Sequence, residues 1–527
     1  MNLANKSALW AVIALCTLLP APPPTLAAQP AQRSAAEAAK VADRALAKAI
    51  IIDTHADTPQ MMLDEVYDLA DPSSPFMISI PKARTGHLGG EFMSIWVDVD
   101  WPKDDLIHRA LDLIDAVDSQ VAAHPNDLAL ATTADDVVRI HRAGKIAVLM
   151  GVEGGHIIQD DPRALDVFYK LGVRYLTLTH TKNDEIGDSS GDQPHWKGLS
   201  DFGRQVVERM NRLGMMVDIS HVSDDTFYAA VATSKAPVIA SHSSCRALCN
   251  QPRNMTDDML RAVAKNGGVV DINFFDGFLD DNFADTLKKV APAMNAEVQA
   301  AQDERKKQGK RLTYFEQGQI DQKYYANLPF PSYTRIADHI DHAVQVAGVD
   351  HVGLGSDFDG ISGMAPRGME DCSKLPDLVR ELARRGYSED DLVKIMGGNV
   401  LRVMRQVEDT ARQMQSSEAA GSDRVSSKQK VYNVGGGVMA PEVIYNPQPV
   451  SSQETRKVTG EATAVLEIVV DPSGNVADAW VLRGVGRGLD EKALALVKTW
   501  KFRPGMKNGV PVAVRLGVEI KFKLFGS

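Results

Sequence analysis

Eight short apolar runs, each followed by a polar or helical stretch, constrain the fold of this 527-residue chain more than any other feature. Most are nearly continuous in Val, Ile, Leu and Met, which is typical of parallel strands buried on both faces. The runs are Ile50–Thr54, Phe92–Val99, Ile146–Val152, Arg174–Thr179, Met215–Ser220, Pro237–Ser241, Gly268–Phe274 and His351–Gly355. This pattern predicts an α/β fold, a (β/α)8 TIM barrel over residues 43–405, and leaves a doubly wound open sheet as the alternative.

The composition and the periodicity of the sequence change after the barrel. Residues 406–454 are rich in Gln, Ser and Gly and lack sustained periodicity, so we interpret them as a linker. Residues 455–527 predict a small α+β domain. Its expected elements are the strands Thr463–Val470 and Ala477–Val485, the helix Asp490–Thr499 and the strand Ala513–Leu524.

The N-terminus predicts export. Lys6 precedes an apolar run from Ala8 to Leu19, and a Pro-rich stretch then leads to small residues at Ala27 and Ala28. This order is typical of a signal peptide, here residues 1–28. The run is too short to span a membrane, so no transmembrane segment is expected in the mature chain. Lipidation at Cys16 and an uncleaved N-terminal anchor are the alternatives.

Composition excludes some classes of protein. The net charge of −11 argues against a general nucleic-acid binder, because phosphate binding needs a basic surface. A chain with 44% hydrophobic residues can bury a large core without disulfides. After removal of Cys16, the cysteines are Cys245, Cys249 and Cys372, and this odd number leaves at least one free thiol or an intermolecular bond. The sequence does not set their pairing.

One connection is much longer than the others. Residues 276–329 separate the seventh and eighth predicted strands and contain a charged helical piece, Ala301–Arg311. A connection after a barrel strand lies on the C-terminal face of the barrel. We therefore expect either a lid over that face or a helical excursion on the surface.

Imidazole and carboxylate side chains follow six of the eight predicted strands. Barrel enzymes carry their catalytic groups at these C-terminal strand ends. His55 and Asp57 follow the first strand and share one face of it, since strand side chains alternate. The remaining residues are Glu153, His180, His221, His242 and Asp357.

This set of side chains predicts a metal centre. Imidazole and carboxylate together suit zinc, and three histidines with three acids exceed one tetrahedral site. Two Zn²⁺ per chain, bridged by a carboxylate, are the economical interpretation, with Glu153 as the natural bridge. Two such ions could share a hydroxide and polarise a carbonyl group.

The motifs around these residues resemble the membrane (renal) dipeptidase family, peptidase family M19 of the amidohydrolase superfamily. The resemblance covers about Ile50 to Val403. It rests on His55-x-Asp57, Glu153-Gly-Gly-His156, Thr177-Leu-Thr-His180, Asp218-Ile-Ser-His221, Ser241-His242-Ser-Ser and Asp357-Phe-Asp-Gly. It implies hydrolysis of the single peptide bond of a dipeptide whose two free termini are both recognised. Members of the family accept a D-residue at the C-terminal position, and some open β-lactam rings.

The resemblance also implies a role for each residue. His55 and Asp57 match the ligands of one zinc, His221 and His242 those of the second, and Glu153 the bridge. His180 matches the histidine that holds the substrate carbonyl oxygen and would stabilise the oxyanion. Arg253 matches the arginine that binds the terminal carboxylate, a task that suits a planar guanidinium. Asp357 matches the aspartate near the substrate amino group and would act in proton transfer.

The last part of the chain resembles the TonB C-terminal domain. The resemblance covers about Val458 to Phe525 and rests on Gly460 to Gly474, Leu489-Asp-Glu-Lys-Ala and Trp500-Lys-Phe-Arg-Pro. From Thr455 onward, twelve Lys/Arg and seven Asp/Glu give a net charge of +5, which leaves −16 for the rest of the chain. This asymmetry favours a separate partner-binding module. The resemblance to TonB implies an envelope protein partner, and together with the expected signal peptide it implies a Gram-negative periplasm. A stabilising appendage without a partner is the alternative, and a homodimer is left open.

Two other functions remain as alternatives. One is a different amidohydrolase, such as a lactonase, a β-lactamase-like enzyme or a deaminase; the other is a non-catalytic periplasmic binding protein. Many other amidohydrolases use His-x-His on the first strand and a modified lysine as the bridge. The pair His55 and Asp57, together with Glu153, favours the dipeptidase branch.

Overall fold

The computed structural model describes residues 32–426, 430–447, 460–485 and 489–524. The expected signal peptide, with Cys16, lies outside these ranges. Among the described helices, none is both long enough and apolar enough to cross a membrane.

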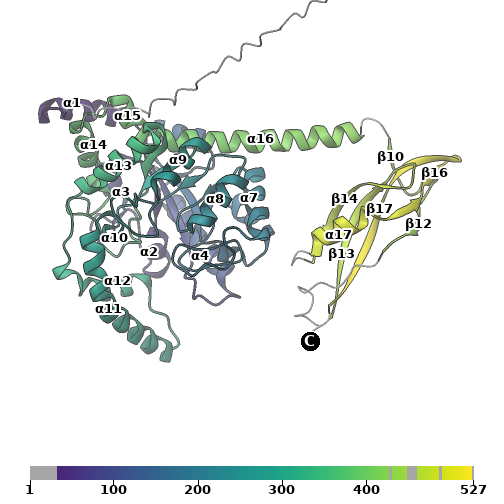
Figure 1. The fold of residues 1–527 in the computed structure, drawn as a ribbon, viewed down its shortest axis with the longest axis horizontal. Helices are drawn as coiled ribbons and strands as arrows, with labels where there is room; N and C mark the ends of the chain where they lie inside the picture. The colour runs from purple at the N-terminus through teal and green to yellow at the C-terminus, as the bar shows by residue number, and fades with distance from the viewer. Residues whose placement is uncertain (1–31, 427–429, 448–459, 486–488, 525–527) are drawn as a thin grey trace, which may run out of the picture.

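Eight parallel strands form a closed ring, which lies within the helical body on the left of Figure 1. They are β1 (Ile51–Ala56), β2 (Leu88–Trp96), β4 (Ile146–Glu153), β5 (Val173–Thr177), β6 (Met216–Asp218), β7 (Ile239–Ala240), β8 (Val269–Ile272) and β9 (Val352–Leu354). The ring closes because β2 pairs with β1 on one side and with β4 on the other. The predicted barrel is therefore confirmed and the open sheet excluded. A short strand, β3 (Leu128–Leu130), pairs with β4 beside the ring.

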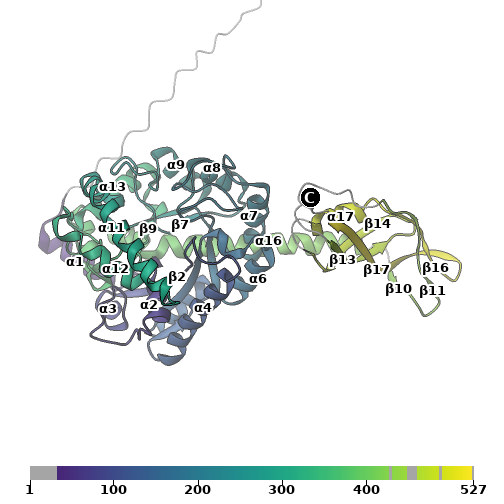
Figure 2. The same cartoon turned by 90° about the horizontal axis from the view of Figure 1, so that it is seen from below.

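Helices surround the ring (Figure 2). Before β9 these are α1 (Ala35–Leu46), α2 (Thr58–Asp64), α3 (Ile80–Thr85), α4 (Leu106–Ala123), α5 (Ala134–Arg142), η1 (Gly155–Ile158), α6 (Pro162–Lys170), α7 (Asp201–Leu213), α8 (Asp224–Thr233), α9 (Asp257–Asn266), α13 (Thr334–Ala347) and η3 (Val349–His351). After β9 come η4 (Cys372–Lys374), α14 (Leu375–Arg384), α15 (Glu389–Val393) and the π-helical turn η5 (Lys394–Gly398).

Side-chain caps fix where several of these helices begin. Ser200, Ser223 and Thr256 each accept a hydrogen bond from the backbone N–H three residues later. Such caps satisfy N–H groups that a helix leaves unpaired at its first turn. The caps thereby set the lengths of the strand-to-helix loops that surround the mouth of the barrel.

The helix α16 (Asn399–Ser426) packs on the barrel and then continues beyond it. Val400, Val403 and Val407 form a buried cluster with Ile52 and Leu149 of the strands. The segment expected as a linker therefore begins as helix, because the apolar spacing of Val403 and Val407 continues in Ala411, which is 5% exposed.

Short strands also occupy part of that segment. They are β10 (Val431–Asn433), β11 (Val438–Met439) and β12 (Glu442–Tyr445). These strands pair respectively with β17 (Val510–Leu524), β16 (Gly505–Lys507) and β15 (Lys501–Arg503) of the C-terminal domain. Residues 431–445 thus form strands together with the C-terminal domain. This differs from the expectation of an unstructured linker.

The C-terminal domain is a sheet with one packed helix, drawn in yellow in Figures 1 and 2. Its elements are β13 (Gly460–Val470), β14 (Val476–Arg483), α17 (Leu489–Val497), β15 (Lys501–Arg503), β16 (Gly505–Lys507) and β17 (Val510–Leu524). The main strand order is β11-β16-β17-β13-β14. Leu466, Ala493 and Trp500 belong to its own buried core, so the predicted α+β domain is confirmed.

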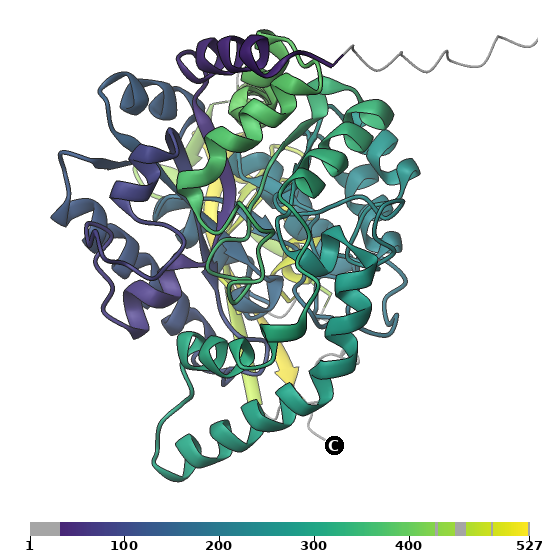
Figure 3. The same cartoon turned by 90° about the vertical axis from the view of Figure 1, so that its left-hand side faces the viewer.

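The long connection between β8 and β9 is helical. It contains α10 (Asp276–Leu279), α11 (Asp281–Lys307), α12 (Tyr314–Gln322) and η2 (Tyr325–Asn327), so the predicted helical piece is part of a longer helix. Figure 3 shows this insertion as teal helices along the lower margin of the barrel. Phe283, Tyr325, Leu328 and Met364 form a small apolar cluster that holds the insertion together.

Candidate metal centre

The structure brings the acidic and histidine side chains from the strand ends together at one mouth. Their ligand atoms fall into three overlapping groups within 4.8 Å. The groups are His55, Glu153 and His242; Glu153, His180 and His221; and His55, Asp57 and Asp357. Glu153 and His55 each belong to two of these groups, so the seven residues form one continuous cluster.

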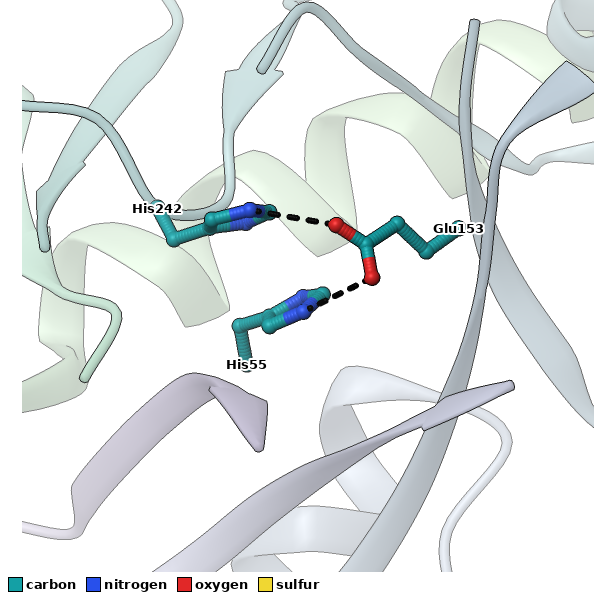
Figure 4. Close-up of side chains that lie close together, drawn as sticks. All are labelled: His55, Glu153 and His242. Carbon is teal, nitrogen blue, oxygen red and sulfur yellow. Dashed lines mark ion pairs between the residues drawn. The ribbon is translucent and has the colours of Figure 1, made fainter. Parts of the chain in front are cut away.

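The carboxylate of Glu153 lies between two sets of ligand atoms. Its Oε2 is 3.3 Å from Nε2 of His55, which in turn is 3.7 Å from Oδ2 of Asp57. Its Oε1 is 3.0 Å from Nε2 of His221 and 3.3 Å from Nε2 of His242. Figure 4 shows His55 and His242 stacked, both facing this carboxylate. Oε2 of Glu153 thus faces His55, whereas Oε1 faces His221 and His242.

Hydrogen bonds behind the cluster orient two of the imidazoles. The Tyr175 hydroxyl donates to the Thr54 carbonyl at 3.2 Å, so it accepts from Nδ1 of His55, which is 2.8 Å away. Ser241 donates to Asp218 and lies 2.7 Å from Nδ1 of His242. With the proton on Nδ1 in both rings, Nε2 presents a lone pair to the cluster, the form that binds a metal ion.

Burial and charge favour a cation at this point. Burial lowers the pKa of His221 and of His242 well below the usual value, which keeps both rings neutral. Burial would raise the pKa of Glu153, but the surrounding histidines, His55 and His180 first, hold it well below its usual range. Burial would likewise lower the pKa of His55, yet Tyr175 and Glu153 raise it well above the usual value. The surroundings of His55 are therefore strongly negative.

The donor set fits zinc. Two donor atoms bound tetrahedrally to one Zn²⁺ at about 2.0–2.1 Å lie roughly 3.3 Å apart. The spacings around Glu153 scatter about this value. Among the described residues, Nε2 of His55 and Oδ1 of Asp57 are buried without a hydrogen-bond partner. Buried polar atoms without partners are rare, and a bound cation would satisfy both.

His180 differs from the other histidines. Nε1 of Trp96 donates to Nδ1 of His180 at 3.4 Å, so in the neutral ring the proton is on Nε2. Burial lowers the pKa of His180, which keeps the ring neutral. Its Nε2 lies 3.6 Å from Oε1 of Glu153, at the rim of the cluster. His180 therefore offers a hydrogen-bond donor at the point where the other histidines offer lone pairs.

Asp357 and Arg253 flank the cluster. Asn273 donates to Oδ2 of Asp357 at 2.9 Å, and burial raises the pKa of Asp357 to about 7. Arg253 donates to the Ser243 hydroxyl at 2.7 Å and to the His242 carbonyl at 2.6 Å. Its Nε is buried without a partner among the described residues.

A pocket of about 690 Å³ opens over the cluster. Asp57, Glu153 and Asp357 form part of its lining. The insertion supplies another part through Asn295 of α11 and Tyr314 of α12. The insertion thus lines the mouth of the barrel.

Sequence reasoning missed several residues that support the site. Tyr175, Ser94 and Asn273 hydrogen-bond to His55, Glu153 and Asp357 respectively. Ser94 and Tyr175 lie within strands, where they look like ordinary strand residues. Only their places in the parallel register mark these two residues. Ser94 lies opposite Gly151, and Tyr175 lies between Gly151 and Met216.

The backbone at two of the site residues is strained. His221 has φ +65° and Asp357 has φ +64°, in the left-handed region that favours glycine. Such conformations cost about 1–3 kcal/mol and cluster at functional sites. His221 follows the end of β6 and Asp357 follows the end of β9, and both side chains contribute ligand atoms to the cluster.

The sequence profile of the family described as membrane dipeptidase, peptidase family M19, matches residues 39–418. The chain belongs to the membrane dipeptidase family. The profile of the Gram-negative bacterial TonB protein C-terminal domain matches residues 447–524. The predicted dipeptidase, fused to a TonB-like domain, is thereby confirmed as a family assignment.

Known relatives agree with this assignment. The dipeptidase is 35% identical over 360 residues to dipeptidase aclJ of Aspergillus oryzae, covering 67% of this chain and 73% of that protein. It is 34% identical over 369 residues to dipeptidase 3 of Mus musculus, covering 68% and 64%. The crystal structure of the probable dipeptidase PvdM from Pseudomonas aeruginosa matches with a TM-score of 0.61 at 27% identity, covering 71% and 100%.

Proposed function

We propose that this dipeptidase binds two Zn²⁺ ions and hydrolyses dipeptides, including those with a C-terminal D-residue. The observation that carries the proposal is the position of Glu153, whose two carboxylate oxygens face different ligand sets. His55 and Asp57 would hold one ion, His221 and His242 the other, and Glu153 would bridge them. When bound, such ions supply a nucleophile at neutral pH and polarise the peptide carbonyl.

The side chains around the ions would position the substrate. His180, with its proton on Nε2, would donate to the carbonyl oxygen and stabilise the developing oxyanion. Arg253 would bind the terminal carboxylate with its unused N–H groups, since a guanidinium has five donors and two are already in use. Asp357, held by Asn273, would accept or return a proton at the scissile nitrogen.

Metal content and substrate range test this proposal together. The mature protein, purified without chelator, should contain about two zinc ions per chain and hydrolyse L-L and L-D dipeptides. N-blocked dipeptides should be poor substrates. Metal without peptide turnover would indicate another amidohydrolase substrate. Absence of metal would contradict the proposal that two bound Zn²⁺ ions carry out the hydrolysis.

We further propose that the enzyme is exported to the periplasm and that the C-terminal domain docks it to an envelope protein. The support is the apolar N-terminal run and the edge strand β14, which carries the exposed side chains Trp480 and Leu482. An edge strand can pair with a strand of another protein.

Site-specific crosslinking in cells tests the docking proposal. A photo-crosslinker at Leu482, which is 62% exposed, should capture an envelope protein. The same group at Tyr228 on α8, which is 45% exposed, should not capture it. Equal labelling at both positions, or none at Leu482, would contradict docking through β14.

A further inference from the structure

The insertion brings a tyrosine to the catalytic mouth. Tyr314 is the first residue of α12, and its ring lies 5.6 Å from that of Trp96, at the end of β2. The preceding residues tie the same segment to the barrel. Arg311 lies over the ring of Trp101 at 3.9 Å, and the Thr313 hydroxyl donates to Glu65 at 2.7 Å. Tyr314 is therefore held in place from the insertion side.

The Tyr314 hydroxyl can act toward the pocket only as an acceptor. It donates its single proton to the carbonyl of Gly360. A tyrosine hydroxyl keeps its proton at neutral pH. The lone pairs of the oxygen remain for a ligand that donates a hydrogen bond.

Two carboxylates lie against Gly360, the residue to which this hydroxyl donates. A β-carbon at Gly360 would lie 2.1 Å from Oδ2 of Asp57 and 2.4 Å from Oδ1 of Asp357, so both carboxylates pack directly against this glycine. Tyr314, Asp57 and Asp357 all line the same pocket. This wall consequently combines negative charge with hydrogen-bond acceptors, which is the arrangement that recognises an ammonium group.

We propose that Tyr314 accepts a hydrogen bond from the N-terminal ammonium group of the dipeptide, next to Asp357. The tyrosine thereby makes a free amino terminus a requirement for efficient turnover. The inference rests on the proposed function, because it assumes that a dipeptide occupies the pocket with its amino end toward Asp357. It assigns a substrate-binding role to the insertion.

The substitution Tyr314→Phe tests the role, because it removes the hydroxyl and keeps the ring against Trp96. A hydrogen bond to a charged group contributes about 1.5–3 kcal/mol, so kcat/KM for L-Ala-L-Ala should fall roughly 10- to 100-fold. The inhibition constant of L-alaninamide should rise by a similar factor, whereas that of N-acetyl-L-alaninamide should change less than about threefold. Tyr324→Phe is the matched control, since the Tyr324 hydroxyl contacts Glu297 within the insertion. It should leave all three values unchanged.

The outcomes separate this inference from the proposed function. If the wild-type enzyme hydrolyses N-acetylated and free dipeptides equally well, recognition of the amino terminus is wrong, and this inference fails with it. If the wild-type enzyme prefers free dipeptides and Tyr314→Phe keeps that preference, only the role of Tyr314 is wrong. An equal loss of affinity for both amides would show a structural role and would also overturn the inference.

Discussion

Oε1 of Glu153 lies 3.0 Å from Nε2 of His221, while Oε2 of the same carboxylate faces Nε2 of His55 at 3.3 Å. A single side chain thus joins the two halves of the site. Exchange of the carboxylate for an amide removes one acceptor oxygen and the negative charge, so the substitution should affect both halves at once.

We expect Glu153→Gln to lose bound metal and dipeptide turnover together. Zinc content by mass spectrometry and kcat/KM on L-Ala-L-Ala measure the two effects. Glu185→Gln, at an exposed carboxylate outside the cluster, is the control and should change neither. A Glu153→Gln enzyme with full zinc content and normal turnover would rule out the bridging role.

Removal of metal should destabilise the dipeptidase. Without a cation, Nε2 of His221 and of His242 face each other at 2.9 Å, and Asp57 and Glu153 both lie beside His55. A ligand that binds only the folded state stabilises it by RT ln(1 + [L]/Kd). The melting temperature should therefore fall after dialysis against chelator and recover on addition of Zn²⁺ but not of Mg²⁺. An unchanged melting temperature would show that no resident ion is bound there.

Tyr175→Phe should weaken metal binding without a change of ligand. The phenylalanine cannot accept the proton of Nδ1 of His55, and this hydrogen bond fixes which nitrogen faces the metal. Loss of such a supporting hydrogen bond typically costs 10- to 100-fold in metal affinity. Competition with a chromogenic chelator measures the change. Tyr228→Phe, on the surface of α8, should match the wild type, and equal affinities for all three proteins would exclude this role.

Asp276 should make stability depend on pH. It is fully buried, and neither carboxylate oxygen has a hydrogen-bond partner among the described residues. Burial raises its pKa to about 9, above the unfolded value of about 3.9. An acid whose folded pKa is raised costs stability progressively as pH rises from the unfolded value toward the folded one. This cost is absent below about pH 4.

Asp276→Asn should remove that dependence. Relative to the wild type, the variant should be more stable in urea at pH 8, and the difference in unfolding free energy should shrink toward pH 5. Asp258→Asn, at an exposed carboxylate on α9, should show no such trend. A constant difference for Asp276→Asn at all pH values would mean that the carboxyl group is not protonated in the fold.

All eight barrel strands could be predicted because parallel strands buried on both faces read as continuous apolar runs. The strand Leu128–Leu130 could not, since three residues give no period. The strands β10 to β12 were missed for a different reason. Val443 and Ile444 are 49% and 66% exposed, so they show no burial pattern, and their pairing partners lie about 60 residues away in the chain.

The residues of the site also divide into those that could be predicted from the sequence and those that could not. His55, Asp57, Glu153 and the later histidines could be predicted, because each follows a strand and the C-terminal ends of barrel strands converge. Tyr314 could not, because nothing in a helical insertion indicates which of its residues reaches the mouth. Only contacts that form in the folded chain, those of Arg311 with Trp101 and of Thr313 with Glu65, place it there.

The contacts of Arg311 and Thr313 also bear on the route by which a substrate would reach the candidate metal centre. They join the insertion to the loops after β1 and β2. A second pocket of about 550 Å³ lies over the loops after β2, β4 and β5 and shares Val99 and Lys182 with the first. Lys182 pairs with Asp100 at 2.6 Å where the two pockets meet. Dipeptides would then arrive, and amino acids depart, through the second pocket and past the Lys182–Asp100 ion pair.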